Sequence, residues 1–181
     1  MSRTQSSGSP PPKRHELYRT AAREFGRALD RLAAGYEADP EKRHDLRQDI
    51  HYQLFKSFDV FDGRCSLKTW VFRVAHNTAV SYVIRERREN AGFVSLEEIE
   101  RTAPSEDREP DIDQQRALQQ LSQFIRQLKP LDRQIMISYL EGMDAATIAE
   151  LTGLSPANVR MKIHRIKKIL AHRIREEQSH A

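Results

Sequence analysis

Cysteine is nearly absent from this sequence, because Cys65 is the only one among 181 residues. A single thiol cannot form a disulfide within the chain, and this cysteine content is typical of proteins of the reducing cytoplasm. No stretch approaches the ~18 consecutive apolar residues that a membrane-spanning helix requires, and the serine- and proline-rich first residues lack the apolar segment of a secretory signal. We therefore expect a cytoplasmic protein without membrane insertion, in which Cys65 is a small loop or core residue.

Glycine is also sparse, and the common catalytic and cofactor motifs are missing. Seven glycines and few runs of β-branched residues favour helix over sheet, so we expect an all-α fold. The sequence has no P-loop, dinucleotide-binding or zinc-site pattern, and its seven histidines lack metal-ligand spacing, so no metal or cofactor is expected. Asp45 and Asp49 share one helical face, but no second helix supplies matching ligands. An exposed acidic face explains them better than catalysis does, and we expect no enzymatic activity.

Charge is distributed unevenly along the chain. Residues 1–14 are basic and rich in serine and proline, which predicts a disordered arm. Residues 94–113 contain eight acidic and two basic side chains, a net charge of −6, together with two prolines, which predicts a flexible acidic linker. The linker separates two basic segments, and we interpret these as two small helical domains, residues 15–93 and residues 114–176.

Apolar residues recur at intervals of three and four in both domains, which predicts amphipathic helices. Gly35 and Pro40 are expected to end the first helix, and Ser66 is expected to cap the third. The predicted helices run over about 17–34, 41–58 and 66–88 in the first domain and over about 118–128, 131–140, 145–152 and 156–175 in the second.

The segment 145–166 has the pattern of a helix-turn-helix, in which two short helices cross steeply through a tight turn. Ala149 is small enough for the helices to approach each other, and Gly153 tolerates the positive φ angle that the turn needs. Leu154 is expected to fill the core within the turn. Ser155 followed by Pro156 is a strong helix start, because it combines a hydroxyl cap with a proline at the first helical position.

The second of these helices separates apolar from basic residues. Its core stripe is Val159, Ile163, Ile166, Leu170 and Ile174. Seven basic residues lie elsewhere on it with no acidic residue among them: Arg160, Lys162, Arg165, Lys167, Lys168, Arg173 and Arg175. A solvated surface normally mixes both signs, so contact with DNA phosphates is the better interpretation. Base readout is expected from the N-terminal half of the helix, with Arg160 and Arg165 as the best candidates for guanine edges.

The helix expected over 66–88 has a polar window on an otherwise apolar surface, which predicts burial on several sides. At 100° per residue, one arc of about 120° holds Trp70, Arg73, His76, Asn77, Arg87 and Arg88. The amide of Asn77 fits base reading and a cap or core position equally well. Trp70 and Phe72 are expected to be core residues rather than base-stacking platforms.

The two halves together resemble the extracytoplasmic-function (ECF) sigma factors, the smallest class of the bacterial sigma family of RNA polymerase subunits. In the first domain the resemblance is carried by Asp45-Leu46-Arg47-Gln48-Asp49-Ile50, Phe58-Asp59-Val60-Phe61 and the run from Lys68 to Ala79. In the second domain it is carried by Leu128-Lys129-Pro130-Leu131-Asp132-Arg133, Glu141-Gly142, Thr147-Ile148-Ala149, Asn158-Val159-Arg160 and Ile163-His164-Arg165. It covers about residues 17–174, and only the tails fall outside it.

The resemblance implies that the first domain is similar to sigma region 2. Such a domain docks on the β′ clamp helices of core RNA polymerase and captures a flipped base of the −10 promoter element. The residues implied in docking are Leu46, Gln48, Asp49 and Gln53. The residues implied in −10 binding are Lys68, Arg73, Asn77 and Ser81, with the loop 63–67 as one wall of the base pocket.

The resemblance also implies that the second domain is similar to sigma region 4 and reads the −35 element, while the acidic linker threads the RNA channel of the polymerase. The residues implied in −35 binding are Arg160, Met161, Lys162, His164, Arg165 and Lys168. Met161 departs from the small hydroxyl residue common in the family, and Ala145-Ala146 from a bulkier or acidic residue. The function implied is promoter-specific initiation of transcription, with core polymerase, promoter DNA and an anti-sigma protein as partners.

Two other binding functions stay open from the residues alone. A repressor or activator would use the helix-turn-helix as a dimer with a ligand-sensing N-terminal domain, but residues 17–93 lack an obvious seam or sensor motif. A helical adaptor that binds only protein fits the like-charged last helix less well. Copurification with core polymerase distinguishes a sigma factor from a regulator that binds duplex DNA alone.

Overall fold

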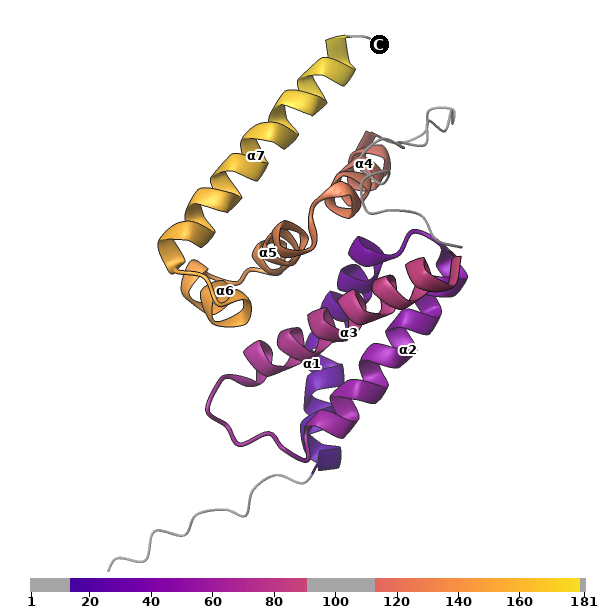
Figure 1. The fold of residues 1–181 in the computed structure, drawn as a ribbon, viewed down its shortest axis with the longest axis vertical. Coiled ribbons are helices and arrows are strands. Elements are labelled where there is room, and N and C mark those ends of the chain that lie inside the picture. Colours follow the sequence, from indigo (N-terminus) through magenta and orange to yellow (C-terminus); the bar gives the residue numbers. More distant parts are fainter. Residues whose placement is uncertain (1–13, 91–112, 180–181) are drawn as a thin grey trace, which may run out of the picture.

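The computed structural model describes residues 14–90 and 113–179, and these two ranges form seven α-helices without any strand (Figure 1). The all-α prediction is confirmed. Nearly all of the predicted arm (1–14) and linker (94–113) lies outside the described residues. The helices are α1 (Arg14–Tyr36), α2 (Pro40–Ser57), α3 (Leu67–Asn90), α4 (Asp113–Gln127), α5 (Pro130–Leu140), α6 (Ala145–Thr152) and α7 (Pro156–Ser179).

The first three helices form a bundle, and side-chain caps set the starts of α2 and α3. The carboxylate of Asp39 accepts hydrogen bonds from the backbone N–H groups of Glu41 and Lys42 at 2.9 and 3.0 Å, at the start of α2. The hydroxyl of Ser66 accepts one from the backbone N–H of Thr69 at 3.0 Å, which confirms the predicted cap of α3. The buried side chains between these helices include Leu29, Leu46, Ile50, Leu54, Phe72 and Ala75.

The last three helices contain the predicted helix-turn-helix, formed by α6 and α7. Gly153 follows α6 with φ of +73°, the left-handed conformation that glycine adopts without strain. The hydroxyl of Ser155 accepts a hydrogen bond from the backbone N–H of Asn158 at 3.3 Å and so caps α7. Ala149 and Val159 are buried, and Leu154 packs against the same core. The two helices are therefore held together as the sequence predicts.

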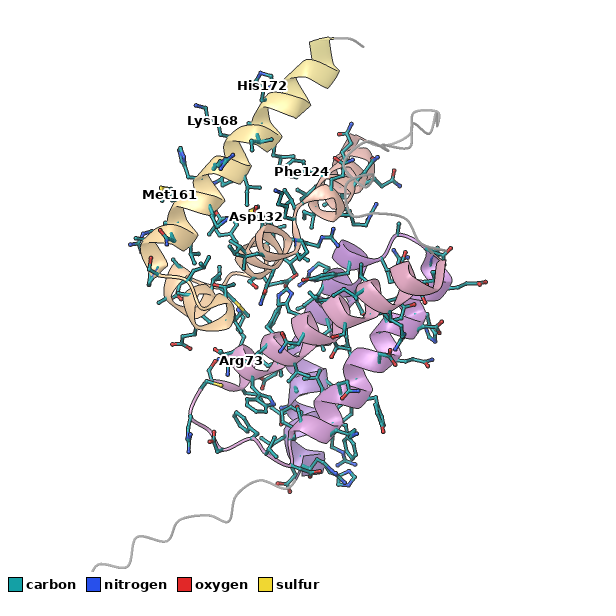
Figure 2. The ribbon with its side chains drawn as sticks, in the orientation of Figure 1. Arg73, Phe124, Asp132, Met161, Lys168 and His172 are labelled. Carbon is teal, nitrogen blue, oxygen red and sulfur yellow. The ribbon has the colours of Figure 1, made fainter. Side chains whose placement is uncertain are left out.

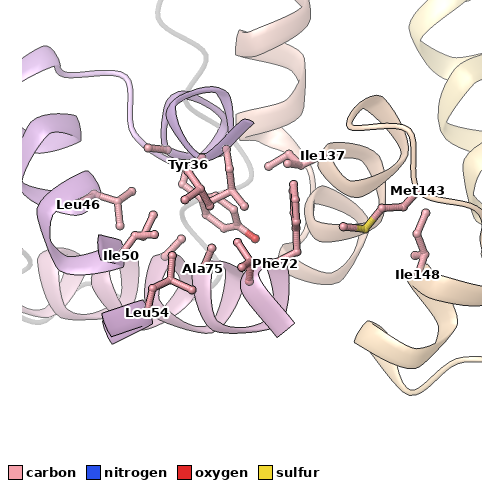
Figure 3. Packing of buried hydrophobic residues seen from close by; sticks show 14 of the residues in the cluster. Tyr36, Leu46, Ile50, Leu54, Phe72, Ala75, Ile137, Met143 and Ile148 are labelled. Atoms are coloured by element: carbon pink, nitrogen blue, oxygen red, sulfur yellow. The ribbon is translucent and has the colours of Figure 1, made fainter. Parts of the chain in front are cut away.

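The two groups of helices pack directly on each other, because α1 and α3 contact α4, α5 and α6. The apolar core runs without a break from one group to the other (Figure 3). Tyr36 and Phe72 lie on the N-terminal side of it, and Ile137 and Met143 on the C-terminal side.

Gly35 permits this close approach. A Cβ atom added to Gly35 would lie 2.8 Å from Cδ1 of Ile137, which is closer than such atoms normally come. The first helix ends at Tyr36, one residue after Gly35 and before Pro40, close to the predicted end. Gly35 is also the point where α1 meets α5.

Within residues 14–90 and 113–179, none of the helices combines the length and apolarity needed to cross a membrane.

Candidate nucleic-acid interfaces

The first candidate interface is the outer face of α7. Val159 and Ile166 are buried and anchor the helix to the domain core. On the opposite side Met161 and Lys168 point away from α4 and α5 (Figure 2). The exposed residues of this outer face are Arg160, Met161, His164, Arg165 and Lys168. The structure therefore brings five of the six predicted −35 residues onto one exposed surface.

The sixth residue, Lys162, is placed differently. Its side chain is half-buried, and its ammonium donates a hydrogen bond to a carboxylate oxygen of Asp132 on α5 at 2.8 Å. Lys167 also turns toward α5, with its ammonium 5.5 Å from the ring centroid of Tyr139. Sequence reasoning missed the ion pair because Asp132 precedes Lys162 by 30 residues and only the fold brings them together. Lys162 holds α7 to α5 in this structure.

The second candidate interface is an open groove of about 470 Å³ between α2 and α3. Asn77 and Ser81 line it from α3, while Asp49 and Gln53 line it from α2. Arg85 spans the groove and donates a hydrogen bond to a carboxylate oxygen of Asp49 at 3.2 Å. Two predicted −10 residues and two predicted docking residues therefore share one polar groove.

The exposure and position of Asn77 exclude the cap and core alternatives that the sequence leaves open, and base reading stays a prediction. Its side chain is exposed, so it is not a core amide. It also lies in the interior of α3, more than two turns after Leu67, so it caps neither end. An exposed amide beside a groove is free to bond a ligand.

The other two predicted −10 residues, Lys68 and Arg73, face the C-terminal helices. The ammonium of Lys68 donates a hydrogen bond to the backbone carbonyl of Glu141 at 2.9 Å. The guanidinium of Arg73 donates one to the backbone carbonyl of Glu150 on α6 at 3.5 Å. Both side chains are half-buried. The structure does not place them in the groove with Asn77 and Ser81.

His76 is fully buried between the two groups of helices, so its predicted place in an open polar window is wrong. Its Nδ1 atom lies 3.0 Å from the hydroxyl of Tyr36, and its Nε2 atom lies 3.0 Å from the hydroxyl of Ser138 on α5. Burial lowers the pKa of His76 from 6.5 to about 3 and raises the pKa of Tyr36. The helical wheel could not reveal this, because the covering helix α5 comes more than 50 residues later in the chain.

An ion pair at the edge of the same contact joins the two groups of helices. The guanidinium of Arg31 donates hydrogen bonds from Nε and Nη2 to the two carboxylate oxygens of Glu141, at 2.7 and 2.6 Å. The hydrogen bond with Glu141 raises the pKa of Arg31. The Glu141 side chain is only 8% exposed, whereas that of Arg31 is 62% exposed. The exposed guanidinium limits the contribution of this pair to about 1 kcal/mol or less.

Leu46 and the aromatic residues of α3 complete the comparison with the sequence predictions. Leu46 is fully buried in the bundle core, so its side chain is not available to a docking partner, whereas Gln48 is exposed. Phe72 is fully buried, which confirms its predicted core position. Trp70 is half-buried, and its indole N–H donates to the hydroxyl of Ser57 at 3.0 Å. Cys65 lies half-buried in the loop before α3.

Comparison with known families assigns both groups of helices. The family model described as "Sigma-70 region 2" matches residues 21–89, which include α2 and most of α1 and α3. The model described as "Sigma-70, region 4" matches residues 118–170, which include α5, α6 and most of α4. Together the two models cover about two thirds of the chain.

Comparison with individual proteins points the same way. The RNA polymerase sigma factor YlaC of Bacillus subtilis (strain 168) is 24% identical over 128 residues, 70% of this chain and 74% of YlaC. The fold resembles that of CnrH in complex with the cytosolic domain of CnrY, with a TM-score of 0.64, 19% identity and coverage of 91% of this chain and 90% of CnrH.

The fold also resembles that of the sigma factor RpoE in complex with the anti-sigma factor NepR from Bartonella quintana. The TM-score is 0.66 at 19% identity, and the match covers 87% of this chain and 96% of the matched chain. Sigma regions 2 and 4 thus follow each other in the family's order, and the second ends in an exposed basic helix. The chain belongs to the sigma-70 family, as an ECF-type sigma factor that directs transcription.

Proposed function

We propose that this protein binds core RNA polymerase and directs initiation at promoters that carry specific −10 and −35 elements. The observation that carries the proposal is the pairing of two exposed surfaces, the groove beside Asn77 and the basic outer face of α7, on the two sigma regions of one chain. The chain supplies recognition, and the polymerase supplies the chemistry. Its place of action in this proposal is the cytoplasm.

The outer face of α7 is proposed to enter the major groove of the −35 element. The second helix of a helix-turn-helix reads bases with its N-terminal residues. Arg160 and Arg165 are exposed there, and a guanidinium bonds the O6 and N7 atoms of guanine through two hydrogen bonds. His164 lies beside them, and Lys168 is placed to contact a phosphate.

The groove between α2 and α3 is proposed to receive a base of the −10 element. Extrusion of a base costs a few kcal/mol, so the receiving site must exist beforehand. Asn77 offers both a donor and an acceptor to a base edge, and Ser81 lies one turn further along α3. Asp49 and Gln53 line the facing wall, and with Gln48 they are proposed to dock on the β′ clamp helices.

The contact between the two groups of helices bears on how the surfaces are used. Lys68 and Arg73 donate to backbone carbonyls of the C-terminal helices in this arrangement. Both side chains are half-buried against the C-terminal helices and lie outside the lining of the groove that holds Asn77. We therefore propose that the two domains separate when the protein engages polymerase and promoter.

An anti-sigma protein is proposed as the regulatory partner. Both structural neighbours are complexes, CnrH with the cytosolic domain of CnrY and RpoE with the anti-sigma factor NepR. The present chain aligns with those bound sigma subunits over nearly its whole length. We call the arrangement in which the two groups of helices contact each other the closed arrangement. A partner that binds it would keep Lys68 and Arg73 against the C-terminal helices.

In vitro transcription with core polymerase and a library of promoter sequences tests the proposal. We expect the full chain to form a holoenzyme and to select promoters with two conserved elements. Asn77→Ala should retain polymerase binding but lower open-complex formation, read as permanganate reactivity of melted thymines. Ile84→Ala, at an exposed position of α3 outside the groove lining, is the control and should leave open-complex formation unchanged. Binding of duplex DNA by a dimer without polymerase would instead support a conventional repressor or activator.

A further inference from the structure

We infer that Met161 is a specificity residue that recognises the C5-methyl group of a thymine in the −35 element. This inference rests on the proposed function, because it requires that α7 enters the major groove. It concerns the one residue with an apolar side chain among the five exposed residues of the outer face.

Met161 lies at the centre of the basic face of α7. At 100° per residue, Lys168 is about 20° and His164 about 60° to one side of it, and Arg165 is about 40° to the other side. Met161 is 66% exposed, and its side chain projects away from α4 and α5 (Figure 2). The centre of such a face comes nearest to the floor of a groove whose phosphates are bound at its edges.

Packing within the protein does not account for Met161. Val159 and Ile166 are buried and hold α7 to its domain, with Ile163 packed against the same core. The other exposed large apolar residue on the described part of α7 is Ile169, which is 42% exposed and lies two turns later. An exposed apolar chain among cations gains free energy only when a ligand covers it with an apolar group.

The major groove offers one group of that kind. Guanine, adenine and cytosine present donors and acceptors there, whereas thymine also presents a methyl group. The methionine side chain is unbranched and polarisable, so it adapts its shape to a small apolar partner. Its sulfur is only a weak acceptor, so it would satisfy the other bases poorly. Arg160 and Arg165 on either side would fix the register in which Met161 meets the thymine.

Replacement of single thymines by deoxyuridine removes only the methyl group and tests the inference directly. Holoenzyme made from the full chain is assayed on its selected promoter, with each −35 thymine of both strands replaced in turn. At one position we expect promoter binding to fall about fourfold, the change expected for one buried methyl group. With Met161→Ala holoenzyme, thymine and deoxyuridine should bind equally at that position.

Ile169→Ala is the matched control, since it removes an exposed apolar side chain from the same helix. It should keep the fourfold preference for thymine. Met161→Leu, which restores an apolar side chain of similar size, should recover part of the preference.

Three results would overturn the inference. Wild-type holoenzyme that binds thymine and deoxyuridine equally at every −35 position would do so, as would a selected −35 element without thymine. Loss of polymerase or protein-partner binding in Met161→Ala, with the methyl preference intact, would assign Met161 to a protein interface. The proposed function fails separately, if transcription by the wild-type holoenzyme does not depend on the −35 sequence at all.

Discussion

The two helices that carry the candidate DNA contacts, α3 and α7, differ in how much of their surface the protein itself uses. α3 packs against α1, α2, α5 and α6, and its side chains Val71, Phe72, Ala75 and His76 are fully buried. α7 lies at the edge of the described helices and contacts α5 and α6 (Figure 1). Most of the basic residues on its described part, residues 156–172, are exposed. Substitutions in α3 therefore test the fold as well as recognition, whereas those on the outer face of α7 test recognition almost alone.

The two proposed surfaces also differ in how many of their side chains are exposed in this structure. Arg160 and Arg165 are exposed as the structure stands. Lys68 and Arg73 are engaged with backbone carbonyls of the other domain. The proposed −35 surface is thus exposed in this arrangement, whereas Lys68 and Arg73 would join the proposed −10 surface only after the proposed separation of the domains.

The largest expected effect comes from the buried side of this comparison. Phe72→Ala removes a ring that packs against Phe25 and His76, and we expect the free energy of unfolding to fall by about 3–5 kcal/mol. His164→Ala on the outer face of α7 should change it by about 0.5 kcal/mol or less. Urea unfolding followed by circular dichroism measures both values. Equal losses in the two variants would show that α7 is as deeply packed as α3.

The next effect concerns recognition rather than stability. Arg160→Ala or Arg165→Ala should each cost about 1–3 kcal/mol of discrimination between −35 sequences if the guanidinium bonds a guanine edge. Run-off transcription from promoters with single −35 changes measures this discrimination. Lys168→Ala is the control, because loss of a phosphate contact lowers activity on all promoters alike. An unchanged −35 preference in both arginine variants would remove them from base readout.

Acidification should lower the free energy of unfolding through the protonation of His76. Its pKa is about 3 in the folded protein against an ordinary value of 6.5, so below pH 6.5 only the unfolded chain takes up the proton. The contribution of His76 to the free energy of unfolding is therefore fully present above pH 6.5, and it is lost as the pH drops toward 3. Between pH 7.5 and 5.5 the loss should be about 1.4 kcal/mol.

The control for this prediction is His76→Gln, which removes the titrating group but keeps a polar side chain. The groups nearest to His76 are the hydroxyls of Tyr36 and Ser138. The guanidinium carbon of Arg133 lies 5.3 Å from the centroid of the Tyr36 ring. His51, whose pKa burial also lowers, contributes equally to both proteins and cancels. We expect a shallower pH dependence of the free energy of unfolding in His76→Gln. Parallel curves for the two proteins would contradict the assignment.

The smallest expected effect is at the exposed edge of the domain contact. Arg31→Ala removes the ion pair with Glu141, and we expect a stability loss of about 1 kcal/mol or less, since the guanidinium is largely exposed. The buried Glu141 carboxylate then loses its partner, which favours separation of the domains. Small-angle X-ray scattering should detect a larger radius of gyration than in the wild type.

Arg23→Ala is the matched control, because Arg23 lies on the same helix and its contact with Glu24 is long, at 3.9 Å. It should leave the radius of gyration unchanged. An equal expansion in the two variants would mean that the Arg31–Glu141 pair does not hold the closed arrangement.

The helices and their boundaries follow closely from the sequence, because they depend on local interactions. The Ser66 cap, the left-handed Gly153 and the Ser155-Pro156 start of α7 all lie where they are predicted. The basic face of α7 is equally local, since residues three and four apart share a face. Five of the six residues that the family resemblance implies for −35 binding are exposed together on this face.

What the sequence did not reveal depends on residues far apart in the chain. His76 belongs to a polar arc when α3 is considered alone, but α5 covers it and supplies Ser138 as its partner. The sequence places Gly35 at a helix end, but it does not reveal that α1 approaches Ile137 there. In both cases the deciding neighbour lies more than 60 residues away.

The sequence by itself determined the helical class and the residues on the outer face of α7, because hydrophobic spacing and capping act over one or two turns. The order of the two sigma regions followed from the resemblance of its motifs to the family. Only the tertiary structure decided which polar residues are free. It pairs Lys162 with Asp132, Arg31 with Glu141, and Lys68 with the carbonyl of Glu141, over separations of 30 to 110 residues. These pairings arise when packed helices bring distant side chains within hydrogen-bond distance, and no local pattern in the sequence encodes them.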